Sequence, residues 1–213
     1  MDYQTEFDKQ IKTLLDLEYP KCASLTNEQF VQKITPLRKH LDSLPPYKFN
    51  IAKGFVPFVI VITNKLIPEE AKMTKVSLYG KFGLVKLKPH TSKDFSPIDS
   101  LDIPDTSFYL LVGIQRGKKY LNVRPCDALI DITKRGRTPL TIDEGIAILT
   151  QYPEFLVKNN CFSLLGSRNQ NDKRVPAIWI NSKKEPNLGW CWGGNPHTWL
   201  GSASALERVN DWI

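Results

Sequence analysis

The chain has 213 residues, of which 41% are hydrophobic and 24% charged, and its formal net charge is +7. This composition is typical of globular proteins, and the apolar runs are too short for a bilayer-spanning helix, which needs about 18–20 residues. The first residues also lack the basic and apolar regions of a signal peptide. We therefore expect a cytoplasmic protein with no membrane partner, and the positive charge favours an anionic partner.

The N-terminal segment has the periodicity of amphipathic helices. Apolar residues at three- and four-residue spacing predict a first helix that ends where Tyr19-Pro20 prevents its continuation. A second helix begins at Thr26, which forms a capping box with Gln29, and Pro36 predicts a kink or a restart. Residues 1–46 are therefore a predicted helical arm, for which two roles stay open: packing on the core, or a homodimer surface.

Extended segments follow this arm. Residues 55–62 form a continuous apolar and β-branched run, which predicts a strand buried on both faces, and residues 107–114 predict another. Residues 76–87 are expected to be extended, with one face in solvent. The polar, proline-rich residues 89–104 predict a long surface loop, and long loops in compact domains often bind ligands.

The second half of the chain alternates turns, helices and strands. We expect a turn at 116–119, with residues 120–123 pairing back, and a helix at 126–133. Another helix begins after Thr141, which forms a capping box with Glu144. The remaining predictions are strands at 162–165, 175–180 and around Trp190 and Trp192, a short helix at 202–209, and Trp212 packing against the end of the chain.

This order of elements predicts the α+β class. Strands precede a central capped helix at about 142–152, and further strands follow it without the strict alternation of a doubly wound sheet. We expect one α+β domain over residues 1–213, in which the helical arm (1–46) joins a sheet-containing core (47–213). The sheet is expected to be antiparallel or mixed.

Cysteines and histidines form no recognisable metal or disulfide pattern. Cys22, Cys126, Cys161 and Cys191 are widely separated and form no CxxC pair, so we expect reduced, structural thiols. A zinc site needs three or four convergent ligands, and the three histidines are scattered as well. The nucleotide-binding patterns GxxxxGK[ST] and GxGxxG are also absent, so the sequence predicts no metal and leaves any cofactor unknown.

Three motifs are specific enough to compare with known families. They are GRTPLTIDEG at 136–145, RVPAIWI at 174–180 and GWCWGGNPHTWLG at 189–201. Together with the opening helix, they resemble a family of uncharacterised bacterial proteins over nearly the whole chain. The resemblance implies a bacterial, cytoplasmic, single-domain protein with no established activity, and it implies no catalytic residue.

The third motif concentrates unusual chemistry. Residues 189–202 contain three of the five tryptophans, with one histidine and one cysteine. Cys191 could act as a nucleophile with His197 as its base and Asn195 orienting the imidazole, because a thiol needs a base to form the thiolate. Glu144 is an alternative partner of His197. A cysteine between two strand tryptophans is also typical of a core residue, and a loop histidine often only bonds to backbone, so both interpretations stay open.

Basic residues indicate a second kind of site. Residues 116–137 contain seven cations, and arginine offers a planar fork to phosphate or carboxylate. The helix N-terminus at Thr141 adds backbone amides, although Glu144 satisfies part of it. The predicted ligand-binding residues are Arg137, Arg168, Trp190, Trp192, Asn195 and His197.

The function stays open between classes. A binding protein for a small anionic or polar ligand is the leading hypothesis. A hydrolase or transferase that depends on Cys191 and His197, or on Glu144 and His197, is the alternative, so enzyme activity stays undecided. Tryptophans among basic residues also allow single-stranded nucleic acid, but the usual nucleic-acid-binding motifs are absent, so this partner is not favoured.

Overall fold

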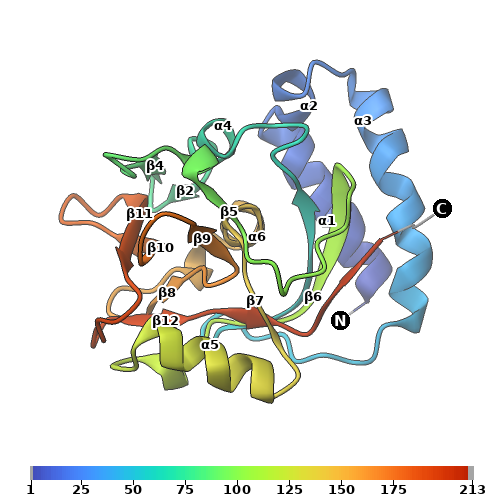
Figure 1. The fold of residues 1–213 in the computed structure, drawn as a ribbon. Coiled ribbons are helices and arrows are strands. Elements are labelled where there is room, and N and C mark those ends of the chain that lie inside the picture. The colour runs from blue at the N-terminus through green and yellow to red at the C-terminus, as the bar shows by residue number, and fades with distance from the viewer. Residues whose placement is uncertain (1, 211–213) are drawn as a thin grey trace.

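The protein, described here by a computed structural model over residues 2–210, contains two larger sheets (Figure 1). The first, the N-sheet, has the order β1-β6-β13-β7 with β14 also on β6, and its strands are β1 (Phe55–Ile62), β6 (Phe108–Gln115), β7 (Thr138–Pro139), β13 (Ser204–Ala205) and β14 (Glu207–Val209). The second, the C-sheet, has the order β12-β8-β10-β11-β4, and its strands are β4 (Leu84–Val85), β8 (Cys161–Ser163), β10 (Arg174–Ile180), β11 (Pro186–Trp192) and β12 (Leu200–Ser202).

Helices and two short strand pairs complete the fold, and the predicted α+β class is confirmed. The α-helices are α1 (Tyr3–Asp16), α2 (Tyr19–Cys22), α3 (Asn27–Ile34), α4 (Glu69–Met73), α5 (Pro125–Lys134) and α6 (Ile142–Gln151). The 3-10 helices are η1 (Thr35–Ser43), η2 (Ser92–Asp94), η3 (Lys118–Tyr120) and η4 (Pro153–Phe155). The short antiparallel pairs join β2 (Ser77–Leu78) to β3 (Lys81–Phe82), and β5 (Phe95–Pro97) to β9 (Ser167–Asn169).

The N-terminal helices cover one face of the N-sheet, on the side drawn in blue in Figure 1. Phe7 of α1 and Phe30 of α3 are buried in one apolar cluster with Phe58 of β1 and Phe108 of β6. The rings of Phe30 and Phe108 meet edge to face, with centroids 5.6 Å apart. The apolar stripe of the helices is therefore buried against the sheet, and this burial stabilises the packing.

Two local signals in this region had different outcomes. The predicted capping box of Thr26 and Gln29 is confirmed. The predicted end of the first helix is wrong, because α1 already ends at Asp16 and Pro20 lies in the first turn of α2. A proline is tolerated there, since an amide in the first turn has no partner within the helix.

β1 and β6 separate two apolar cores. They pair antiparallel, from Phe55 opposite Gln115 to Ile62 opposite Phe108. Because successive strand residues point to opposite faces, Ile60 contacts the N-terminal helices whereas Val61 contacts the core on the α6 side. A strand between two cores must be apolar on both faces, and the predicted strand over 55–62 is confirmed.

α6 runs through the interior between the two sheets (Figure 1). Its capping box, in which Thr141 and Glu144 bond each other's backbone amides, is confirmed. Nearly all its side chains are buried, and Gly145 lies against Leu164, so close that an added Cβ would be 2.5 Å from that side chain. A larger residue at position 145 would therefore require the Leu164 side chain, which directly follows β8, to move.

The C-sheet is mixed. β10 pairs antiparallel with β8 and with β11, and these three strands correspond to the strands predicted at 162–165, 175–180 and around Trp190 and Trp192. β12 is parallel to β8, and β4 is parallel to β11. The predicted extended region at 76–87 is broken into the short strands β2, β3 and β4.

Three local predictions are corrected. Residues 202–209 are not a helix, because β13 and β14 pair with the N-sheet. Residues 120–123 do not pair back, since η3 and a turn occupy this stretch. The predicted loop at 89–104 contains η2 and β5, and its Phe95 is buried. Trp212 lies outside the described residues. Within 2–210, no helix is both long and apolar enough to cross a membrane.

Candidate functional site

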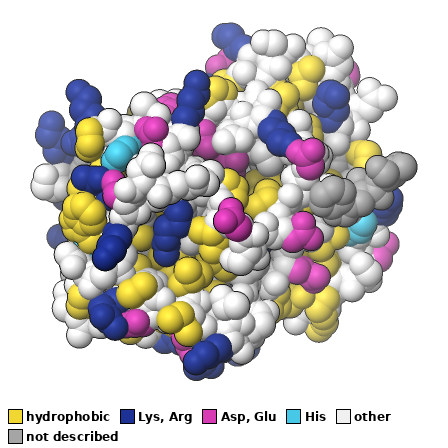
Figure 2. All heavy atoms as spheres, viewed as in Figure 1, with side chains coloured by type: hydrophobic (Ala, Val, Ile, Leu, Met, Phe, Trp, Pro, Cys, Tyr) yellow, Lys and Arg dark blue, Asp and Glu magenta, His cyan; other side chains and the backbone are white. Residues whose placement is uncertain are grey.

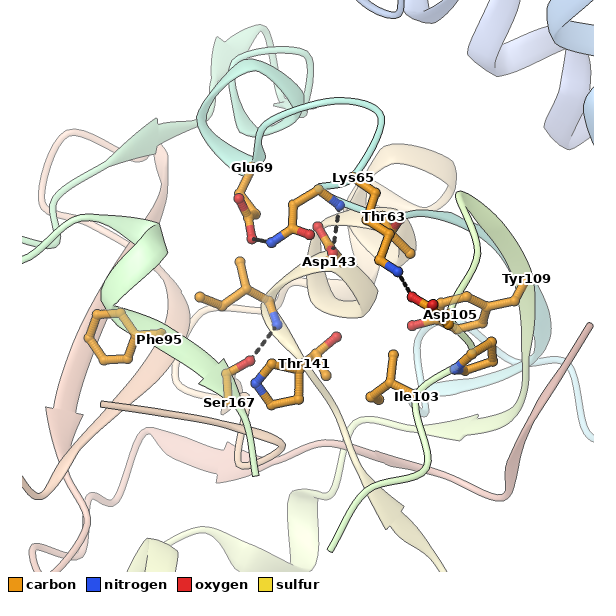
Figure 3. A pocket seen from close by; sticks show the side chains of 14 residues that line it. Thr63, Lys65, Glu69, Phe95, Ile103, Asp105, Tyr109, Thr141, Asp143 and Ser167 are labelled. Carbon is orange, nitrogen blue, oxygen red and sulfur yellow. Dashed lines mark hydrogen bonds and ion pairs between the residues drawn. The ribbon is translucent and has the colours of Figure 1, made fainter. Parts of the chain in front are cut away.

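A cavity of about 290 Å³, which we call the α6 cavity, opens at the N-terminal end of α6 (Figure 3). The middle of the face shown in Figure 2 is hollowed, with apolar side chains in the hollow. The lining comes from segments far apart in the chain, so the fold and not a local motif assembles the site. The lining residues are Thr63, Asn64, Lys65, Glu69, Phe95, Pro97, Ile103, Pro104, Asp105, Tyr109, Thr141, Ile142, Asp143 and Ser167.

The end of β1 forms one wall of the cavity. Thr63 continues the pairing with the β6 side, because its amide donates to the Ser107 carbonyl at 3.0 Å. Its hydroxyl donates to the Thr106 carbonyl at 2.9 Å. These two bonds fix the direction in which the chain leaves the sheet, and they place Asn64 beside the start of α6.

Asp143 lies at the base of this wall with a buried lysine behind it. The Lys72 side chain is 2% exposed, pairs with Asp143 and donates to the Ile62 carbonyl at 2.5 Å. Asp143 also accepts a hydrogen bond from the Asn64 amide at 3.0 Å. Burial raises the pKa of Asp143 to about 6, and Lys72 offsets part of this effect. Asp143 is therefore partly protonated not far below neutral pH.

Glu69 supplies a second carboxylate beside Asp143. It is buried, and it accepts hydrogen bonds from the side-chain amide of Asn64 at 2.8 Å and from the Ser92 hydroxyl at 3.1 Å. Asn64 therefore bridges the two carboxylates: its backbone amide donates to Asp143 and its side-chain amide donates to Glu69. The charge of Glu69 contributes to the raised pKa of Asp143.

The charged groups around the cavity carry a small negative excess. Lys65 and Asp105 form an ion pair at the rim (Figure 3). With the buried Lys72, Glu69 and Asp143, the described residues place two ammonium groups against three carboxylates, which gives a net charge of −1 when all are ionised. The cavity therefore favours a neutral or cationic molecule over an anion.

The α6 N-terminus is closed to an anion by the protein itself. The Thr141 amide donates to the Glu144 carboxylate at 2.7 Å, and the Ile142 amide donates to the Ser167 hydroxyl at 3.2 Å. The Glu144 amide donates to the Thr141 hydroxyl at 3.4 Å. These bonds use amides that would otherwise attract phosphate.

Glu144, a predicted catalytic residue, lies behind the cavity and is fully buried. One carboxylate oxygen accepts from Arg208 at 2.6 Å and from the Tyr109 hydroxyl at 2.8 Å, and the other accepts from Arg208 at 3.0 Å. Its partners within the described residues do not include His197. Glu144 therefore forms a structural ion pair with Arg208, and this pair holds β14 against α6.

The predicted catalytic residues of the third motif occupy different surroundings. Cys191 is buried, its nearest polar partner among the described residues is the Ser163 hydroxyl at 3.8 Å, and burial raises the pKa of its thiol. The ring centroids of His197 and Trp199 are 5.3 Å apart, and the backbone carbonyl of His197 accepts a hydrogen bond from the Asn122 amide. No hydrogen bond or ring contact within 2–210 joins Cys191 to His197, so their pairing stays a prediction.

Trp190 and Trp192, both predicted to bind a ligand, lie side by side, and the cation next to them is Arg174 rather than Arg137 or Arg168. Their rings meet at 5.4 Å, and the Arg174 guanidinium lies over both, at 4.4 and 4.6 Å from the centroids. Asp172 pairs with this arginine. The protein therefore supplies its own cation to these rings. Asn195 is exposed, and its amide closes a turn onto the Trp192 carbonyl at 3.1 Å.

The two arginines predicted to bind an anion are separated from each other. Arg137 donates to the Ser204 hydroxyl at 2.9 Å and to the Gly113 carbonyl at 2.6 Å, and it borders a separate cavity of about 280 Å³. Arg168 lies on β9, and its charge acts on the Cys191 thiol. Neither arginine lines the α6 cavity.

Sequence reasoning missed Lys72, Glu69 and Asp143. Asp143 looked like an ordinary acidic residue in the first turn of a capped helix, and Glu69 and Lys72 lie in a short polar segment. Nothing local shows that Lys72 is buried, since its carboxylate partner lies 71 residues further along the chain. The partial signal was the long loop at 89–104, whose Phe95 and Pro97 line the cavity.

Comparison with known proteins identifies the family. Residues 13–211 match the sequence model of a family described as a family of unknown function (DUF5701). The chain belongs to this family. No curated protein and no solved structure matches it. Membership in DUF5701 confirms the predicted relation to an uncharacterised family, and it implies no substrate or catalytic residue.

Proposed function

We propose that this protein binds a small polar molecule in the α6 cavity. The observation that carries the proposal is the convergence of Asp143, Glu69 and Asn64 on an open space next to a buried lysine, Lys72. Cavities that hold small ligands combine apolar walls with a few well-placed polar groups, and perturbed pKa values cluster at such sites. A volume of about 290 Å³ fits a small molecule.

The charge of the cavity supports one of the two ligand chemistries that the sequence left open, anionic or polar. The carboxylates exceed the ammonium groups, and the amides at the start of α6 already have partners in Glu144 and Ser167. The groups that remain to meet a ligand are mainly hydrogen-bond acceptors. We therefore favour a neutral or cationic molecule that carries hydroxyl or ammonium groups over a phosphate or carboxylate.

A thermal-shift panel of polyols, monosaccharides, small amines and carboxylates tests this proposal. A ligand at about 100 times its Kd adds about 2.7 kcal/mol, which raises the Tm of a protein of this size by about 5–10 °C. We expect a hit among the polyols or amines that is lost in Ile103→Trp, because the larger ring fills the cavity. Leu101→Trp changes the same loop outside the lining and should keep the hit.

Two outcomes would contradict the proposal. One is a hit that survives Ile103→Trp unchanged, because the ligand would then lie elsewhere. The other is a set of hits confined to phosphates and carboxylates, because the charge argument would then be wrong. As a second check, Glu69→Gln should weaken binding of a cationic hit, whereas Glu70→Gln, next to it but outside the lining, should not.

A catalytic role of the same cavity is the second candidate. The pKa of Asp143 near 6 and the adjacent Glu69 give a potential proton donor and acceptor on one side of the space. Incubating any hit with the protein and following its NMR spectrum tests this role. Consumption of the hit that stops in Asp143→Asn, while binding persists, supports catalysis; an unchanged spectrum supports binding alone.

A further inference from the structure

A second hollow lies on the C-sheet side and shares no lining residue with the α6 cavity. Two cavities of about 400 and 330 Å³ are neighbours, because Lys158, Ile180, Asn181 and Ser182 line both, and we treat them together as one groove. Its walls come from the β2–β3 turn, the segment before β8, the β10–β11 turn and the segment before β12. We call it the aromatic groove.

Aromatic side chains border this groove at both ends. Trp179 and Trp199 border the larger cavity, with ring centroids 6.1 Å apart, and the His197 ring packs against Trp199. Tyr79 borders the smaller cavity and is 82% exposed. Trp179 and Trp199 are half-buried and Tyr79 is exposed, so the groove presents aromatic surfaces on which flat groups can stack.

The backbone of Tyr79 is unusual for an aromatic residue. Tyr79 and Gly80 have φ values of 51° and 74°, so both occupy the left-handed region at the tip of the β2–β3 hairpin. Asn or Gly is preferred at the first of these positions, and a bulky side chain there costs free energy. A strained position that displays an exposed ring points to a role for that ring outside the fold.

The charge of the groove is positive. Lys158 and Lys184 line it, and neither forms an ion pair within residues 2–210. No described carboxylate lines the two cavities; Glu185, at the base of the turn, accepts a hydrogen bond from Asn181. Two solvent-exposed lysines without ion-pair partners in the described part of the chain therefore line the same groove as the aromatic rings, in a protein whose net charge is +7.

The geometry points to a site for single-stranded nucleic acid in the aromatic groove, with bases stacked on Tyr79 and Trp199 and phosphates on Lys158 and Lys184. Base stacking and phosphate contacts are the two components of sequence-tolerant single-strand binding. The usual sequence motifs are absent because the rings and lysines come from separate segments that only the fold brings together. The site is independent of the proposed ligand in the α6 cavity.

Fluorescence anisotropy with labelled oligo-dT and oligo-rU of ten nucleotides tests this inference and compares DNA with RNA. We expect binding that weakens steeply with salt. Tyr79→Ala should weaken binding about tenfold, whereas Phe82→Ala should leave it unchanged, because Phe82 is an exposed ring of the same hairpin that does not line the groove.

The lysines give a second, quantitative readout. Each phosphate contact of a single strand contributes about 0.7 to the slope of log K against log salt. The double variant Lys158→Gln/Lys184→Gln should therefore reduce the magnitude of the slope by about 1.4. Lys183→Gln, in the same turn but outside the lining, should leave the slope unchanged.

Several results would overturn the inference. They are no binding of either oligonucleotide at 20–50 mM salt, an affinity that Tyr79→Ala does not change, and duplex DNA or heparin binding as tightly as the single strands, which would indicate a general polyanion surface. Saturable binding of a neutral oligosaccharide that is lost in Tyr79→Ala, without nucleic-acid binding, would assign the groove to carbohydrate instead.

Discussion

The α6 cavity and the aromatic groove differ in the burial and pairing of their charged side chains. Around the cavity, Lys72 and Glu69 are buried, Asp143 is largely buried, and each has partners within the protein. Along the groove, Lys158 and Lys184 are solvated and form no ion pair within 2–210. Buried charges must be paired to be tolerated, whereas exposed ones are free to meet a partner. Changing the charges at the α6 cavity should therefore alter the free energy of unfolding, whereas binding at the aromatic groove should depend on ionic strength.

We expect the largest effect on stability from a substitution that breaks the ion pair between Arg208 and Glu144, behind the α6 cavity. Arg208→Met leaves the Glu144 carboxylate buried without its cation, and we expect a loss of about 3–5 kcal/mol in the free energy of unfolding. The variant Lys158→Met removes a groove cation and should change stability by less than about 0.5 kcal/mol. Urea denaturation of both variants measures the difference. Equal effects would show that the two regions do not differ in their coupling to stability.

A smaller effect appears in the pH dependence of stability. The pKa of Asp143 is about 6 in the folded protein and near 3.8 in the unfolded chain, so the folded state binds more protons between these values. Its contribution to stability is fully present below pH 3.8 and is lost as the pH rises through about 6. Asp143→Asn removes this loss, so wild-type stability relative to the variant should fall by about 1–3 kcal/mol from pH 4 to pH 7.5.

Asp127→Asn is the matched control, because Asp127 lies in the first turn of α5 and its side chain is 44% exposed. A hydrogen bond from Arg124 lowers the pKa of Asp127, so its contribution to stability has the opposite sign. Wild-type stability relative to this variant should rise with pH, or stay constant if solvent screens the pair. Parallel curves for the two variants would show that Asp143 is not perturbed by its buried position.

Local sequence signals predicted many of the helices and strands, whereas the two candidate sites depend on contacts between segments far apart in the chain. The capping box at Thr141 and the β-branched run at 55–62 involve neighbouring residues, so the sequence shows them directly. The prediction of a helix at 202–209 was wrong because strands of two and three residues are too short to show a periodicity, and their pairing with β6 and β7 decides their structure.

The candidate sites were predicted only in fragments for the same reason. The third motif did contain one residue of the aromatic groove, Trp199, but its partners Tyr79 and Lys158 come from distant turns. The α6 cavity contains Thr141, predicted as a helix cap, while the burial of Lys72 depends on three segments that meet in space. No spacing rule covers contacts of this kind.

The smallest effect separates stability from binding at a single residue. In Tyr79→Asn the turn becomes Asn-Gly, which suits the left-handed conformation of both positions, and the exposed ring gives up little packing. We expect the free energy of unfolding to rise by about 0.5–1 kcal/mol while oligonucleotide binding falls about tenfold. Tyr79→Phe keeps both the strain and the ring, so it should match wild type in both measurements. If Tyr79→Asn instead lowers stability, the ring packs on the groove as part of the fold, and an exposed aromatic in a strained turn no longer supports a binding role.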